Sequence, residues 1–192
     1  MQLRVTQFGE PVLEDPGKPV REFGPELEGF VRDMIETMYA EEGVGLAAQQ
    51  VGARRTLFVV DLQLQGSEID FDYRLDDRRP PPELIFPLAC INPEIRETAE
   101  EQEALEEGCL SFPGIRAVIA RPAFTRLRFQ DSQGAWHELY AEGYLARAIL
   151  HEYDHTQGVL FTKRMDRRTL RDLQPKLKKL KRTTRDWLRS RA

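Results

Sequence analysis

The chain has 192 residues, of which 41% are hydrophobic and 31% charged, and this composition suits one globular domain with a substantial core. We find no apolar run long enough to cross a membrane and no signal-peptide pattern at the start of the sequence, so we expect neither a membrane protein nor a secreted one. Cys90 and Cys109 are weak grounds for a disulfide, and a thiol kept for chemistry fits a reducing cytoplasm.

Charge is spread unevenly along the chain. The formal net charge is −4, but residues 163–192 hold thirteen Lys and Arg against three Asp, a net charge of +10 that leaves −14 for the rest. An acidic body with a basic tail suggests an anionic partner for the tail. Leucines recur in the tail at roughly helical intervals, which predicts an amphipathic C-terminal helix that is bent or delayed by Pro175.

Taken in order, residues 1–24 read as strand and loop because prolines and Gly17 interrupt them. Apolar residues at helical spacing predict a helix from Pro25 to about Ala40, which Gly43 ends. A polar, proline-bearing stretch at 63–87 reads as a surface loop insertion. Further strands are predicted at 56–61, 88–92, 94–98, 115–119, 124–130 and 135–141, with a hairpin turn at 131–134 between the last two.

Residues 142–158 carry the strongest chemical signal. They lack proline, are rich in helix formers and contain the sequence HEYDH at 151–155. On a helix, residues four apart lie on one face, so His151 and His155 can reach one metal ion. Glu152 can then lie beside the metal-bound water and take its proton. The alternative is a buried helix that happens to hold two histidines.

A catalytic metal of this kind needs three protein ligands and one open position. No glutamate follows Glu152 in the sequence, so we expect the third ligand upstream, where His137 and Cys109 are the candidates. His137 alternates with polar neighbours in a predicted strand, which favours a surface position over a ligand.

Three motifs occur together: GVGLAAQQ at 43–50, EGCLS at 107–111 and HEYDH at 151–155. In this order and spacing the chain resembles the peptide deformylase family over most of its length. The resemblance implies an α+β fold in which antiparallel sheets surround the HExxH helix, with an N-terminal helix and a basic C-terminal helix. It also implies one catalytic domain over 1–192, with the 63–87 loop as an insertion and 163–192 as a helical tail.

The resemblance further implies that the protein removes the formyl group from the N-terminal formylmethionine of new polypeptides, a step of N-terminal methionine processing in protein biosynthesis. Glu152 would be the general acid/base for attack by a metal-bound water. The side-chain amide of Gln50 and the backbone N–H of Leu110 would face the formyl oxygen. The implied metal ligands are Cys109, His151 and His155, and the implied substrate-binding residues are Val44, Gly45, Leu105, Gly108, Tyr144 and Ala148.

Arg147 stands where many members of that family carry an apolar residue, so on that side the wall of the substrate pocket departs from the family's pattern. Asp154 faces away from the ligand side chains, so we expect it to pair with an arginine such as Arg121. Both expectations can be checked against a structure.

One metal ion per chain is expected, and two lines of reasoning favour different metals. A ligand set of one Cys and two His suggests zinc on coordination chemistry alone. The resemblance implies Fe²⁺, with Zn²⁺, Ni²⁺ or Co²⁺ able to substitute.

The expected partners are N-formylmethionyl nascent peptides and, through the basic tail, ribosomal RNA near the exit tunnel. Neither a membrane nor DNA is expected as a partner. Two other functions remain as alternatives: a general HExxH metalloprotease, and a catalytically silent module that binds ribosomes or peptides.

Overall fold

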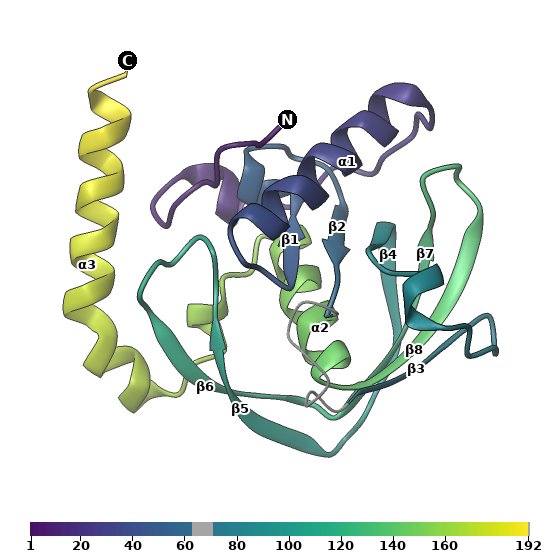
Figure 1. The fold of residues 1–192 in the computed structure, drawn as a ribbon. Helices are drawn as coiled ribbons and strands as arrows, with labels where there is room; N and C mark the ends of the chain where they lie inside the picture. The colour runs from purple at the N-terminus through teal and green to yellow at the C-terminus, as the bar shows by residue number, and fades with distance from the viewer. Residues whose placement is uncertain (63–70, 192) are drawn as a thin grey trace.

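Helix α2 (Tyr144–Thr156) lies in the middle of the molecule, with strands on both sides of it (Figure 1). The computed structural model describes residues 1–62 and 71–191. A six-stranded antiparallel sheet has the strand order β1-β2-β4-β7-β8-β3, and β5 pairs with β6 in a separate two-stranded sheet. The predicted α+β fold is therefore confirmed.

The strands of the described residues fall into two sheets. Those of the large sheet are β1 (Gly45–Ala47), β2 (Leu57–Val60), β3 (Phe71–Leu75), β4 (Leu88–Thr98), β7 (Phe124–Gln130) and β8 (Trp136–Gly143). The smaller sheet is a hairpin of β5 (Gln102–Gly108) and β6 (Arg116–Pro122), in which Leu105 lies opposite Ile119. Cys109 follows the last residue of β5 directly.

Two further α-helices cover the sheets. Helix α1 (Pro25–Ala40) begins at a proline, as predicted, and packs on β1 and β2. Helix α3 (Arg167–Arg189) stands beside the hairpin at the edge of the molecule (Figure 1). Short 3-10 helices occur at η1 (Pro11–Glu14), η2 (Ala48–Val51), η4 (Pro82–Leu84) and η5 (Phe161–Lys163). No helix among the described residues is long and apolar enough to cross a membrane.

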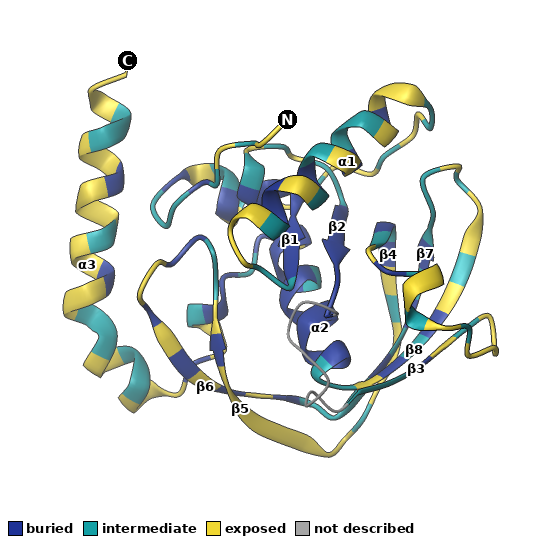
Figure 2. Cartoon of the chain, viewed as in Figure 1, coloured by how far each residue is buried: buried dark blue, intermediate teal, exposed yellow. Residues whose placement is uncertain are grey.

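The sequence of α2 explains its central position. The helix begins after Gly143, whose φ is 62°, and the chain turns away at Gly158, whose φ is 70°. Eleven of its thirteen residues are buried, so the helix is enclosed on nearly all sides, as its dark blue colour shows (Figure 2). A helix buried in this way is fixed by packing on every face, and the side chains that it carries are held rigidly.

Three apolar clusters build the core around this helix. One fills the space between α2 and the large sheet and includes Phe58, Leu127 and Leu139. A second lies between α1 and the strands β1 and β2. The third joins β6 to η1 and to the first turns of α3, where Leu177 is buried. The inner face of α3 therefore belongs to the core.

Part of the predicted loop at 63–87 is a strand. Residues 63–70 lie outside the described residues, but Phe71–Leu75 forms β3 and pairs with β8 at one edge of the large sheet. The prolines at 80–82 masked this strand, because they follow it and gave the whole stretch a loop-like composition.

Three other expectations about the elements need correction. Residues 88–98 form one strand, because the left-handed φ of 50° at Asn92 places a register shift at Pro93 and the strand continues past it. Strand β5 was not predicted, since its sequence QEALEEG is acidic and favours a helix. Pro175 does not delay α3, because Asp166 caps the helix ahead of it by accepting hydrogen bonds from the backbone N–H groups of Arg168 and Thr169.

Candidate active site

Helix α2 and the turn after β5 bring three metal-binding side chains together. The sulfur of Cys109 and one ring nitrogen each of His151 and His155 all lie within 4.8 Å of one another. The Sγ of Cys109 is 3.3 Å from the Nε2 of His155. Within the described part of the chain, no other cluster of three His, Cys, Asp or Glu side chains has this arrangement.

These donors fit a transition metal. A thiolate and two imidazoles are the ligand types that bind zinc and iron, and three ligands leave one position open. The Nδ1 of His151 lies 3.0 Å from Oε2 of Glu107, so the other ring nitrogen, Nε2, is the one left for a metal. His137 takes no part: it contacts Asp76, just after β3, and Asp131, in the turn between β7 and β8, as expected for a surface residue.

Glu152 lies beside the ligands, and its carboxylate is held in a confined space. Its side chain packs against the backbone of β1, and its Oε2 is buried without a hydrogen-bond partner. Burial raises the pKa of Glu152 to about 7, although nearby His151 and Arg121 oppose the shift. A buried carboxylate with one unpartnered oxygen and such a pKa is suited to exchanging a proton.

The two histidines differ in their surroundings. Burial lowers the pKa of His155 far below its ordinary value, so that its ring is neutral and able to bind a metal. Burial also lowers the pKa of His151, but its contacts with Cys109 and Glu107 outweigh this and raise it to about 10. Burial would raise the pKa of Glu107, but its hydrogen bonds with His151 and Arg121 hold it at about 2. Glu107 is therefore a permanent negative charge behind the ring of His151.

Gln50 completes the polar side of the site. It lies on η2, where its Oε1 accepts a hydrogen bond of 2.8 Å from the backbone N–H of Ala47. Its Nε2 lies 3.5 Å from the Sγ of Cys109 and 3.4 Å from the hydroxyl of Ser111. The fixed oxygen orients the amide so that its N–H donors face the cluster of metal ligands.

A cavity of about 490 Å³ opens onto these residues. Cys109, Leu110, His151, Glu152 and Gln50 all line it, as do the expected substrate-binding residues Val44, Gly45, Gly108, Tyr144 and Ala148. Leu105 does not: it lies on β5, 44% exposed, outside the described lining.

Arg121 and Arg147, the two arginines singled out in the sequence, both lie near the cavity. Arg121 donates a hydrogen bond of 2.9 Å to Asp154, so the predicted pair is confirmed. Arg147 lines the cavity but is buried, with its guanidinium bound to Glu107. Sequence reasoning had assigned no role to Glu107, although it stands inside the EGCLS motif.

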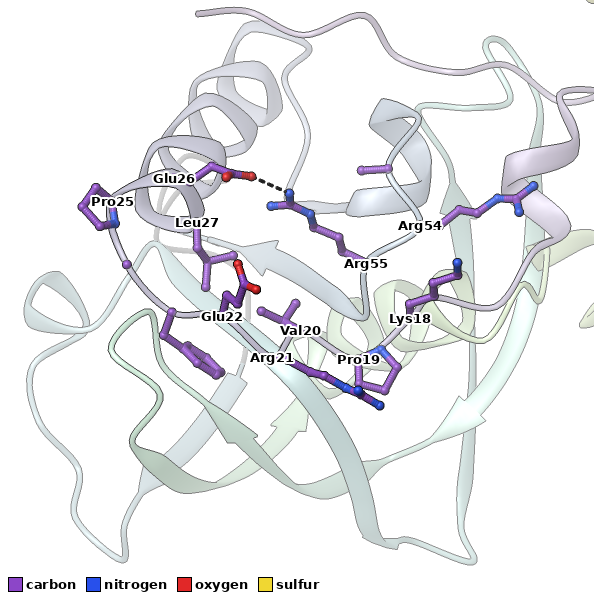
Figure 3. Close-up of a pocket in the computed structure, with 13 residues that line it drawn as sticks. Lys18, Pro19, Val20, Arg21, Glu22, Pro25, Glu26, Leu27, Arg54 and Arg55 are labelled. Atoms are coloured by element: carbon purple, nitrogen blue, oxygen red, sulfur yellow. Dashed lines mark hydrogen bonds and ion pairs between the residues drawn. The ribbon is translucent and has the colours of Figure 1, made fainter.

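A larger hollow of about 680 Å³ lies elsewhere, between residues 18–27 and 53–55 (Figure 3). Four cations line it, but Arg55 is bound to Glu26 at 2.8 Å and Arg54 is paired with Asp15. None of the metal-binding side chains lines this hollow, so we assign the chemistry to the smaller cavity.

A buried HExxH helix, a thiolate as third ligand and an adjacent glutamate define a metal-dependent hydrolase site. The sequence model of the polypeptide deformylase family matches residues 2–171. The chain is 43% identical over 186 residues to a peptide deformylase of Opitutus terrae, with 96% of each chain covered. It is 40% identical over 180 residues to that of Thermotoga maritima, covering 94% of this chain and 97% of the relative.

Solved structures agree with the sequence comparison. A peptide deformylase from Synechococcus elongatus in complex with actinonin matches with a TM-score of 0.77 at 39% identity, covering 91% of this chain and 87% of that one. The Thermotoga maritima enzyme matches with a TM-score of 0.73 at 40% identity, covering 86% and 99%. The chain belongs to the polypeptide deformylase family.

Proposed function

We propose that this protein removes the formyl group from the N-terminal formylmethionine of newly synthesised polypeptides. The observation that carries the proposal is the cluster of Cys109, His151 and His155 beside a cavity that Glu152 and Gln50 line. Membership of the polypeptide deformylase family supports the same reaction and disfavours both a general protease and a silent binding module.

The three ligands would hold one metal ion per chain, which when bound supplies a Lewis acid that activates water at neutral pH. We propose Fe²⁺ as the metal in the cell, in line with the family, and Zn²⁺, Ni²⁺ or Co²⁺ as replacements that the same donors accept. Cys109 must remain a free thiol for this role, and both cysteines are free. This requirement supports a reducing compartment, the cytoplasm.

Proton transfer and stabilisation of the developing negative charge are assigned to residues of this chain. Glu152 takes a proton from the attacking water and returns it to the amine that leaves. The amide of Gln50 and the backbone N–H of Leu110 donate hydrogen bonds to the formyl oxygen as negative charge develops on it. Both donors are fixed before substrate arrives, because Gln50 is anchored by Ala47 and Leu110 follows a metal ligand.

We assign substrate contacts to the other residues of the same cavity. Tyr144 and Ala148 lie on the first turns of α2 and would border the methionine side chain together with Val44. Backbone groups of Val44, Gly45 and Gly108 would pair with an extended peptide as an added strand, since β1 and β5 both pass the cavity. Leu105 lies on β5 outside the lining of this cavity, and its contact with the substrate stays a prediction.

We further propose that α3 contacts ribosomal RNA. Its inner face packs on the core, whereas Lys178, Lys179 and Arg182 are exposed and form no ion pair among the described residues. Clustered exposed cations on one face of a helix suit a phosphate backbone.

Release of formate from a formyl-methionyl peptide by the metal-loaded protein tests the proposed deformylase activity. Cleavage of peptide bonds instead would favour a general protease.

A further inference from the structure

Arg147 is a buried cation in the first turn of α2, and its charge needs partners there. Only 4% of the residue is exposed. Its Nη1 donates to Oε1 of Glu107 at 2.7 Å and to the backbone carbonyl of Ile119 at 2.9 Å. Its Nη2 donates to the backbone carbonyl of Glu103 at 2.6 Å. The guanidinium is thus held by three acceptors.

These acceptors lie on both strands of the hairpin. Glu103 and Glu107 belong to β5, and Ile119 belongs to β6. Cys109 follows the end of β5, while His151 lies one turn after Arg147 on α2. The contacts of Arg147 therefore fasten the helix that carries two metal ligands to the strand that leads to the third.

Glu107 links Arg147 to His151, one of the proposed metal ligands. Its Oε1 accepts hydrogen bonds from Arg147 and from the Nε of Arg121 at 2.6 Å. Its Oε2 accepts from the Nη2 of Arg121 at 3.1 Å and faces the Nδ1 of His151 at 3.0 Å. A carboxylate held from both sides fixes the ring to which it is bonded, and such supporting contacts orient metal-binding histidines.

Arg147 is one of two buried guanidinium groups in this network. Two carboxylates, Glu107 and Asp154, face two buried guanidinium groups, Arg121 and Arg147. Arg164 also binds Asp154, but its side chain is 49% exposed and it forms no hydrogen bond or ion pair with Glu107 in the described part of the chain. Without Arg147, Arg121 would be the one buried guanidinium left for both carboxylates, and His151 would be the one residue of α2 still bonded to Glu107.

We infer that Arg147 is a positioning residue of the metal centre, which sets β5 against α2 and thereby places Cys109 and the ring of His151. The inference rests on the metal site of the proposed function. It assigns to Arg147 an effect on the binding of the metal itself, beyond any effect on folding.

The test compares Arg147→Met with Arg164→Met, which removes a neighbouring arginine of the same network without touching Glu107. Metal-free protein is titrated with Co²⁺ in competition with a chelator, and the thiolate-to-cobalt absorption band is recorded. We expect Arg147→Met to weaken Co²⁺ binding by about 10–100-fold and to alter the band, since that is the usual effect of losing a partner of a metal ligand. Arg164→Met should bind Co²⁺ as the unchanged protein does.

Arg147→Lys is the second variant, and it decides the matter if Arg147→Met does not fold. Lysine restores the charge but cannot reach three acceptors at once, so we expect an affinity between those of the other two proteins. Unchanged Co²⁺ affinity and an unchanged band in the arginine-147 variants, measured well below their unfolding temperatures, would overturn the inference even if stability fell. Failure of the unchanged protein to bind Co²⁺ is a different result, because it would contradict the metal site and the proposed function.

Discussion

The backbone of Gly45 lies directly against the carboxylate of Glu152. A Cβ added to Gly45 would be 2.6 Å from Oε1 of Glu152, far inside van der Waals contact. Because β1 and α2 approach this closely, the position of the proposed general base depends on a residue without a side chain.

Gly45→Ala is therefore expected to push Glu152 out of place and lower kcat by about 10²-fold, the usual effect of a displacement near 1 Å in an active site. Metal content should stay the same, because the three ligands are not touched. Gly29→Ala is the matched control: a Cβ there meets nothing nearer than an atom of Arg32 at 3.9 Å, and alanine favours a helix. An unchanged kcat in Gly45→Ala would show that Glu152 is not confined as described.

Gln50→Ala removes an amide donor that faces the cluster of metal ligands. We expect kcat to fall by about 10²–10³-fold while metal content is retained, since loss of one donor to a developing oxyanion has this effect. Gln49→Ala is the control, because the neighbouring amide donates instead to the carbonyl of Thr156 and supports the fold. Steady-state kinetics with a formyl-peptide distinguishes the two, and equal kcat values in both variants would remove the oxyanion role from Gln50.

Arg121→Met should destabilise the protein strongly. Arg121 is 3% exposed and binds both Glu107 and Asp154, so its loss leaves two buried carboxylates with fewer partners. Breaking a buried ion pair in this way costs about 3–5 kcal/mol of unfolding free energy.

Arg116→Met is the comparison for Arg121→Met. The Arg116–Glu106 pair lies on the surface, with side chains 65% and 59% exposed, and its loss should cost less than about 1 kcal/mol. Urea unfolding at one protein and metal concentration measures both variants. Similar losses of stability would contradict the role given to the buried network.

Reversing the charges of Lys178, Lys179 and Arg182 to glutamate should weaken binding to ribosomes. These side chains are exposed, so the fold and the rate on a free formyl-peptide should be unaffected. The slope of log affinity against log salt should also become shallower, since fewer phosphates are neutralised. Truncating the helix would be a poorer test, because Leu177 and Thr184 are buried. Ribosome affinity that does not change would argue against the contact.

The sequence was informative where a pattern repeats at a fixed period or spacing. The helix at 25–40 and the hairpin around 131–134 follow from apolar periodicity and turn residues, and the structure confirms both. Strand β5 was missed because an acidic strand with six of its seven residues exposed has no apolar alternation to detect. Strand β3 was missed because neighbouring prolines dominated the composition.

In the site too, residues at a fixed sequence spacing were predicted, and residues that meet only through the fold were not. The side chains that could bind a metal stand at motif spacing, and the structure brings them together as expected. The pair of Arg121 and Asp154 was also anticipated. Glu107 and Arg147 were not given roles, because their importance arises from contacts between β5, β6 and α2 that no local pattern encodes.

Release of formate from formyl-Met-Ala-Ser tests the account most directly. Protein purified without oxygen and loaded with Fe²⁺ is compared with Cys109→Ala and Glu152→Ala treated identically. The account predicts formate release by the unchanged protein, loss of release with loss of metal in Cys109→Ala, and loss of release with metal retained in Glu152→Ala. No formate from the iron-loaded protein, or full activity in either variant, would contradict it.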